Sequence, residues 1–147
     1  MIHFEGDKSF AVPLPEVAAK LSDAGFLVNA LPDAKVTEAT PDRAAWKLRP
    51  KLAFLMGSLD TVMEVTGREP DRAVGFKVST KAIGASSTVL TRLEFRPADG
   101  GTLVHWTGDL TEVTGLLKMV PKGLLQSTAE KVIQDVWAAV AAKLTGA

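Results

Sequence analysis

The sequence has no cysteine and no tyrosine among its 147 residues. The absence of cysteine excludes disulfide bonds, thiol nucleophiles and thiolate metal ligands, and it favours an intracellular compartment. The absence of tyrosine excludes phenolic acid–base chemistry. A chain of this length buries roughly 70% of its unfolded surface in one domain, so it needs neither a disulfide nor a metal for stability. We therefore expect a single domain over residues 1–147 and a cytoplasmic location.

A charge excess of either sign is also lacking. The 17 basic and 17 acidic residues cancel and are scattered along the chain, which argues against nucleic acid as a main partner. The first residues lack the basic start and apolar stretch of a secretory signal. No apolar run reaches the roughly 18 residues that span a bilayer. Any membrane contact is therefore expected to be peripheral, at the inner face of the membrane.

Most of the chain shows the two-residue period of β-strands. Strands are predicted at residues 2–12, 44–54, 59–67, 73–82, 86–96 and 102–113. The short turns between them are typical of an antiparallel meander. Pro50 indicates that the strand 44–54 lies at a sheet edge or carries a bulge. Two short helices are predicted within 14–30, because Pro15 suits a first helical turn and Asp23 or Gly25 breaks the segment.

The period changes to that of a helix in the last third of the chain. Pro121 and Gly123 interrupt the first two turns, which predicts a break there and a continuous helix from about Leu124 to Leu144. So long an amphipathic helix has too much apolar surface to stand alone, and we expect it to pack across the sheet. The apolar residues at three- and four-residue steps are Leu117, Val120, Leu124, Val132, Ile133, Val136, Trp137, Val140 and Leu144.

Several short motifs along the chain match one known superfamily. They are Phe4-x-Gly6, Phe10-x-Val12-Pro13, Leu31-Pro32, Ile83-Gly84-Ala-Ser-Ser, Gly101-Thr-x-Val104-x-Trp106, Asp109-Leu110 and Gly115-Leu-Leu. On these residues the chain resembles the SRPBCC superfamily, which includes START lipid-transfer domains and the birch pollen allergen relatives. Within it, the chain is most similar to the G-subunit family of carbon monoxide dehydrogenase.

The resemblance implies an α+β helix-grip fold. In this fold a curved antiparallel sheet of about seven strands wraps around a long C-terminal helix, and two short helices follow the first strand. A sheet that curls around one helix can enclose a hollow. The expected occupant is a hydrophobic small molecule, because apolar pockets with few polar anchors are typical of such ligands.

The predicted ligand-binding residues lie on the concave parity of the sheet and on the inner face of the helix. They are Trp46, Leu48, Phe54, Met63, Phe76, Val78, Val89, Leu93, Trp106, Leu117, Val120, Leu124, Ile133, Val136 and Trp137. The same residues could instead fill a solid core, and the tryptophans could be plain core residues that contact no ligand. Both interpretations stay open at this point.

No catalytic residue, metal ligand or cofactor is predicted. His3 and His105 fall on the polar parity of their strands, and neither a Ser-His-Asp order nor a His-Glu-x-x-His spacing occurs. General acid–base catalysis needs a titratable group within reach of a substrate. His105 and Asp109 share one solvated strand face, and two sparse ligands make a poor metal site.

The segment Gly115–Leu125 combines six large apolar residues with two lysines. It carries helix breakers where a regular helix should begin. If exposed, it could act as a portal flap or dip into a membrane surface. The alternative is that it simply packs over the end of the sheet.

The residues and the resemblance together predict a non-catalytic binding or carrier protein for a lipid, quinone or polyketide-like compound. The resemblance further implies an accessory role to a membrane-linked redox enzyme. Two alternatives stay open. A polyketide cyclase or aromatase would need a titratable group such as His3, His105 or Glu38 inside the cavity. A protein-interaction module, like the Hsp90-activator relatives, would use the outer face of the sheet.

Overall fold

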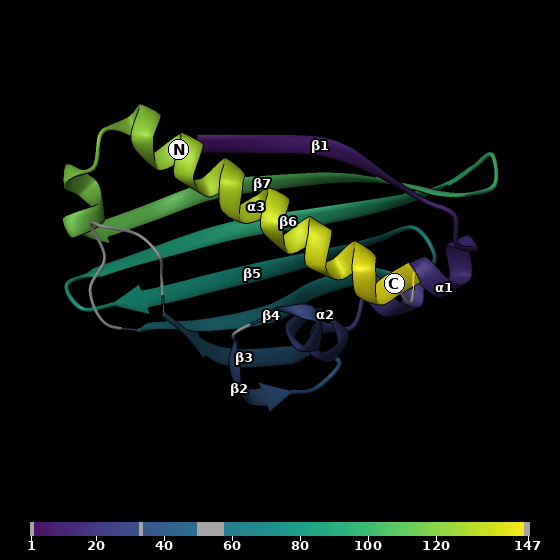
Figure 1. The fold of residues 1–147 in the computed structure, drawn as a ribbon, viewed down its shortest axis with the longest axis horizontal. Coiled ribbons are helices and arrows are strands. Elements are labelled where there is room, and N and C mark those ends of the chain that lie inside the picture. The colour runs from purple at the N-terminus through teal and green to yellow at the C-terminus, as the bar shows by residue number, and fades with distance from the viewer. Residues whose placement is uncertain (1, 33, 50–57, 146–147) are drawn as a thin grey trace.

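The computed structural model describes residues 2–32, 34–49 and 58–145, with only the backbone of Leu116. Seven antiparallel strands form one curved sheet in the order β1-β7-β6-β5-β4-β3-β2, and a long helix, α3 (Lys122–Thr145), crosses it (Figure 1). The strands are β1 (Ile2–Phe10), β2 (Lys35–Ala39), β3 (Arg43–Leu48), β4 (Leu59–Glu69), β5 (Ala73–Ala82), β6 (Ala85–Ala98) and β7 (Gly101–Gly115). This is the helix-grip fold that was predicted.

The strand pattern predicted every strand except β2. Each of its five residues is exposed, so its sequence shows no alternation of apolar and polar side chains. It lies at the sheet edge and pairs only with β3, with a register shift between Val36 and Glu38. The strand predicted at 44–54 is confirmed as far as Leu48, where β3 ends. Its continuation from Pro50 to Phe54 lies outside the described residues.

Two short helices follow β1, as predicted. They are α1 (Leu14–Leu21) and α2 (Ala24–Ala30). Pro15 stands in the first turn of α1, where its missing N–H costs nothing. The side chain of Asp23 caps α2 by accepting a hydrogen bond of 3.2 Å from the N–H of Phe26. The break between the two helices therefore falls at a capping residue.

The main core lies where α1 and α2 meet the C-terminal half of α3 and the sheet. Val17, Leu21 and Val104 are fully buried there, and Val140 and Leu144 of α3 are nearly so. A smaller cluster lies under the N-terminal half of α3. It consists of Ile2, Phe4 and Leu110, with Val89, Trp106, Val113, Leu125, Ala129 and Ile133 packed against it. The helix is thus held mainly at its C-terminal end.

The break before the long helix occurs where the sequence predicted it. A short 3-10 helix, η1 (Leu116–Met119), follows β7, and α3 begins after Pro121. Gly115 precedes η1 with a φ of 63°, and a Cβ there would collide with the carbonyl of Gly84. Only glycine fits this left-handed turn against the β5–β6 connection.

The predicted inner face of α3 is partly wrong. Leu124 and Val136 are 49% and 37% exposed. Val132, also 49% exposed, lines the cavity described below, as expected of the inner face. The residues that face the sheet form one narrow stripe at steps of three or four: Leu125, Ala129, Ile133, Trp137, Val140 and Leu144. The exposed residues precede this stripe by one position, a rotation of about 100° around the helix axis. The sequence pattern merged these two neighbouring stripes into one face.

Candidate ligand-binding site

An apolar cavity of about 180 Å³ lies between the N-terminal half of α3 and one end of the sheet. It is partly open to solvent, and residues around the β5–β6 turn and Leu117 of η1 form one part of its lining. The described residues that line it are Leu59, Thr80, Ala82, Ala85, Ser86, Ser87, Leu110, Val113, Leu117, Leu125, Thr128, Ala129 and Val132. The lining is mostly aliphatic, and many of its members are small, so the sheet and the helix leave a space between them here.

The polar groups in this cavity are hydroxyls. The Thr80 hydroxyl shares a hydrogen bond of 3.3 Å with that of Thr61, and the Ser86 hydroxyl shares one of 2.5 Å with that of Thr114. Ser87 and Thr128 contribute the remaining hydroxyls. Among the described lining residues none is titratable. The cavity can therefore hold an apolar group and accept or donate a hydrogen bond, but its described lining offers no general acid or base.

The other half of the space under α3 is filled. Trp137 lies between two aromatic rings, with ring centroids 6.2 Å from Phe10 and 6.3 Å from Trp106. Val140 and Leu144 are buried beyond it. The sequence left open whether this space is a solid core or a hollow. The half under the C-terminal part of α3 is a solid core, and the half near η1 is hollow.

The predicted binding residues divide between these regions. Leu117 lines the cavity. The filled core contains Trp46, Phe76 and Leu93, with Leu48, Met63, Trp106 and Trp137 packed against it. The smaller cluster is contacted by Val89 and Ile133. Of the remaining residues, Val78 and Val120 are half-buried, Leu124 and Val136 are exposed, and Phe54 lies outside the described residues. Direct ligand contact by this set stays a prediction.

Small residues of the cavity were missed by the sequence interpretation. Ala82, Ala85, Ser87 and Ala129 line the cavity although none is large or aromatic. A search for large apolar side chains finds the walls of a packed core, whereas a hollow forms where side chains are short. The run of small residues from Gly84 to Ser87 was the available signal.

Trp106 carries an unpaired polar group beside the smaller apolar cluster under the N-terminal half of α3. Its indole Nε1 is buried and has no hydrogen-bond partner among the described residues. Trp106 packs against both the filled core and the smaller cluster that includes Leu110 and Leu125. A buried indole N–H normally finds a partner. Trp106 is not among the residues that line the cavity, so this donor would contact a ligand only if the ligand reached beyond the described lining.

Both histidines lie on the outer face of the sheet, between β1 and β7. The Nδ1 of His3 is 2.5 Å from Asp109 Oδ1, and the Nδ1 of His105 is 2.8 Å from Asp7 Oδ1. Glu5 lies between the two rings, 3.4 Å from His3 Nε2 and 3.9 Å from His105 Nε2. The hydrogen bonds to Asp109 and then to Glu5 raise the pKa of His3. These groups face solvent and do not reach the cavity.

In the described part of the chain, no carboxylate enters the cavity and no metal-binding cluster is seen. Glu38 is exposed and forms an ion pair of 2.8 Å with Arg43, so it too lies outside the cavity. No group of three histidine or carboxylate side chains among the described residues is arranged to hold a metal ion. None of the described helices is long and apolar enough to cross a membrane.

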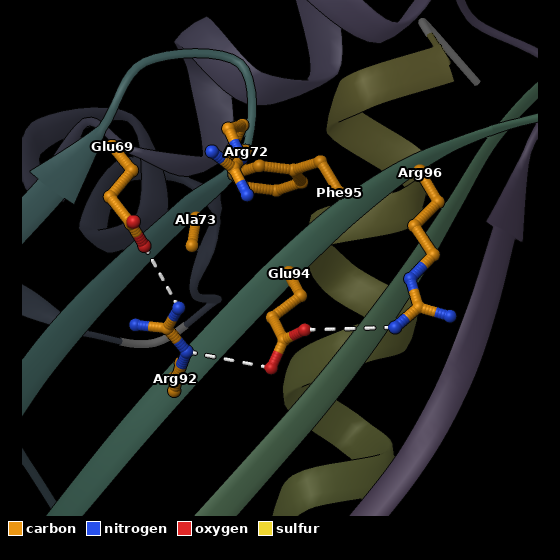
Figure 2. A pocket seen from close by; sticks show the side chains of 7 residues that line it. All are labelled: Glu69, Arg72, Ala73, Arg92, Glu94, Phe95 and Arg96. Atoms are coloured by element: carbon orange, nitrogen blue, oxygen red, sulfur yellow. Dashed lines mark hydrogen bonds and ion pairs between the residues drawn. The ribbon is translucent and has the colours of Figure 1, made fainter.

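A second hollow, of about 270 Å³, lies on the outer face of the sheet, with α3 behind it (Figure 2). Ion pairs connect Glu69 to Arg92 at 2.9 Å, Arg92 to Glu94 at 3.5 Å and Glu94 to Arg96 at 3.9 Å. The hydrogen bond from Arg92 to Glu69 raises the pKa of this guanidinium further. This hollow is larger than the apolar cavity, but its charges mostly satisfy one another in solvent, so it does not suit an apolar ligand.

Comparison with known families gives a match over nearly the whole chain. The model of the family described as polyketide cyclase / dehydrase and lipid transport matches residues 1–145. No curated protein matches the chain.

Solved structures share the fold over nearly the whole chain. A conserved protein from Geobacillus kaustophilus has a TM-score of 0.84 at 19% identity, covering 99% of this chain and 96% of that one. A protein from Chromobacterium violaceum has a TM-score of 0.70 at 13% identity, with coverages of 97% and 96%. A Mycobacterium smegmatis protein has a TM-score of 0.67 at 18% identity, with coverages of 98% and 91%. At these identities the likeness concerns the fold alone.

Proposed function

The chain belongs to the family described as polyketide cyclase / dehydrase and lipid transport, within the SRPBCC superfamily, and we propose that it is a non-catalytic carrier of a hydrophobic small molecule. The ligand is held between the sheet and the N-terminal half of α3. The observation that supports this most directly is the apolar cavity of about 180 Å³, whose described lining offers hydroxyls but no titratable group.

The size of the cavity limits what can be held inside it. An apolar cavity of roughly 150 Å³ accommodates a molecule such as benzene. The cavity at α3 therefore suits one ring or a short alkyl segment. A lipid, quinone or polyketide-like compound would place its ring or chain end inside and extend through the opening beside Leu117.

The test combines ligand identification with a variant that fills the cavity. Native mass spectrometry and organic extraction of the purified protein should reveal a lipophilic ligand. Ala129→Phe places a ring into the cavity from α3, and we expect it to weaken binding of a fluorescent apolar probe such as 1-N-phenylnaphthylamine by about tenfold or more. Ala138→Phe, at an exposed position of the same helix, should bind the probe like the parent protein.

If Ala129→Phe lowers the melting temperature, the smaller change Ala129→Leu serves as a second variant that fills the cavity with less strain. It should give an intermediate loss of probe binding. Equal probe binding by the parent protein and both Ala129 variants, together with the absence of any extracted lipophilic ligand, would contradict the proposed function.

An enzymatic role of the cyclase or aromatase type has less support from the described residues. His3 and His105 face solvent on the outer side of the sheet, and Glu38 pairs with Arg43 at the surface. The protein-interaction alternative is supported by no specific feature of the outer face, because its charged hollow is largely closed by its own ion pairs.

A finer proposal concerns the redox partner. The motifs Ile83-Gly84-Ala-Ser-Ser and Gly115-Leu-Leu carry the resemblance to the G-subunit family of carbon monoxide dehydrogenase. They contact each other through Gly84 and Gly115 and contribute residues to the cavity lining beside the opening proposed above. An accessory role to a membrane-linked redox enzyme would place a ligand such as a quinone at that opening. Incubation of the protein with quinone-containing vesicles tests this role. Quinone recovered with the protein fraction would support it, and a protein fraction without quinone would exclude quinone as the ligand.

A further inference from the structure

The β5–β6 turn and η1 meet at one end of the molecule. Gly84 in the turn lies against Gly115, so closely that a side chain on Gly115 would collide with the Gly84 carbonyl. Both segments, together with the start of α3, lie at the same end of the sheet in Figure 1. We refer to Ile83, Lys118, Met119, Lys122 and Leu124 as the docking edge.

Large apolar side chains protrude from this edge. Met119 is 80% exposed and Ile83 is 74% exposed, the two highest values among the exposed large apolar residues of the described chain. Leu124 follows at the beginning of α3 with 49%. Exposed apolar side chains that gather on two adjoining turns mark a surface that binds a partner or a membrane. Their position at the tips of turns lets them project into a soft apolar phase.

The chain segments that carry these side chains hold charges of one sign. Residues 81–88 and 113–129 contain three lysines and no acidic residue. Lys118 and Lys122 are exposed and make no ion pair with any residue in the described ranges. Lys81 lies opposite Asp60 in the β4–β5 pairing and is not part of the docking edge. A basic apolar edge is complementary to an anionic lipid surface.

The lining of the apolar cavity extends to the same edge. Leu117, two residues before Met119, lines the cavity, and so does Ala82, next to Ile83. A bilayer that contacts Ile83 and Met119 would therefore lie beside this part of the cavity lining. The ligand could pass between bilayer and cavity without crossing water.

We propose that the docking edge binds the surface of an anionic lipid bilayer, with Ile83, Met119 and Leu124 entering the apolar layer and Lys118 and Lys122 contacting lipid phosphates. A second copy of the chain is a poorer occupant because it would bring the same lysines together. A few protruding side chains also provide less area than a stable protein interface requires.

Vesicle co-sedimentation of the full chain tests the proposal. Binding should be seen with vesicles of equal parts phosphatidylcholine and phosphatidylglycerol, and should be weak with phosphatidylcholine alone. It should also fall in about 1 M salt, where the Debye length is about 3 Å. Binding that is equal for both vesicle types, or absent for both, would overturn the proposal.

Apolar variants locate the contact. Met119→Ser and Ile83→Ser should each weaken vesicle binding by about tenfold, because each removes one side chain from the lipid-contacting set. Leu90→Ser is the matched control, since Leu90 is 44% exposed on the outer face of β6, away from the edge. All three positions are exposed, so the fold should be retained. Equal loss with Leu90→Ser would place the contact elsewhere and overturn the proposal.

Charge variants test the lysines. Lys118→Gln and Lys122→Gln should each weaken binding to anionic vesicles by about fivefold, whereas Lys77→Gln, at an exposed position within β5, should not. The cavity variant Ala129→Phe should still bind vesicles, which separates this proposal from the proposed function. Analytical ultracentrifugation without lipid would reveal a dimer through this edge, and a dimer abolished by Met119→Ser would overturn the bilayer proposal.

Discussion

Gly6 of β1 and Trp106 of β7 are directly paired in the sheet, and the indole of Trp106 lies against the glycine backbone. A Cβ placed on Gly6 would come within 2.9 Å of the Cζ2 atom of the ring. The glycine thus provides the space in which the indole lies flat. From there Trp106 contacts Trp137 and joins the filled core to the cluster beside the cavity.

Gly6→Ala should therefore destabilise the protein. The added methyl group must displace the Trp106 ring, and overpacking of this kind costs about 1–3 kcal/mol. Gly67→Ala is the matched control, because Gly67 lies in β4 and a Cβ there would meet nothing within 4 Å. Urea unfolding measures both. Equal midpoints for the two variants would show that the indole moves aside without cost.

The unpaired N–H of Trp106 leads to a prediction about ligand preference. Acetophenone and ethylbenzene have similar shapes, but only the ketone can accept a hydrogen bond. If the bound ligand reaches Trp106, the parent protein should bind the ketone about two- to tenfold more tightly than the hydrocarbon, the range expected for one hydrogen bond. Trp106→Phe should abolish this preference.

The ratio of the two affinities, measured by titration calorimetry, isolates the contribution of the Trp106 N–H to ligand binding. Loss of ring volume in Trp106→Phe affects both ligands alike and cancels in the ratio. The matched variant Trp137→Phe keeps the Trp106 N–H and should keep the preference. A preference for the ketone that persists in Trp106→Phe would assign the hydrogen bond to another donor, such as the Thr128 or Ser87 hydroxyl.

The pair of His3 and Asp109 predicts how stability depends on pH. The pKa of His3 is raised in the folded protein, first by its hydrogen bond to Asp109 and then by that to Glu5. Protonated His3 therefore stabilises the fold. This contribution is fully present below the unfolded pKa of about 6.5 and is lost as the pH rises through the higher folded value.

Asp109→Asn should lower the urea midpoint at about pH 5.5 and leave it nearly unchanged at about pH 8.5, where His3 is neutral in both states. The effect should be small because both side chains are partly exposed, 50% for His3 and 34% for Asp109. Glu112→Gln, an exposed change on the same strand, is the control. A destabilisation of the same size at both pH values would indicate a role of Asp109 that does not involve His3 protonation.

The sequence predicted the order of most elements because their patterns are strong. The strands with one buried face alternate clearly, and the Pro15 and Asp23 signals locate α1 and α2. β2 was missed because a strand whose residues are all exposed has no hydrophobic period. The small residues of the cavity were missed for a related reason. A hollow is bounded by what side chains do not fill, and Ala82 or Ala129 carries no signal of its own.

The buried face of α3 is a second feature that could not be predicted from the sequence. Valine recurs at positions 132, 136 and 140, so the sequence alone gives no ground for treating Val136 and Val140 differently. The structure separates them, because Val140 is 2% exposed and Val136 is 37% exposed. The sheet curves around only one line of the helix, and contact along that line is a tertiary property that no local pattern contains.

This difference gives a direct test of the orientation of α3. Val140→Ala removes two buried methyl groups from the filled core and should cost about 1–3 kcal/mol of unfolding free energy. Val136→Ala is the same change one helical turn earlier, and it should be neutral or slightly stabilising because alanine has the higher helix propensity. Thermal and urea unfolding of the two variants give the comparison. Equal losses would mean that both valines face the sheet and that α3 is rotated from the position described.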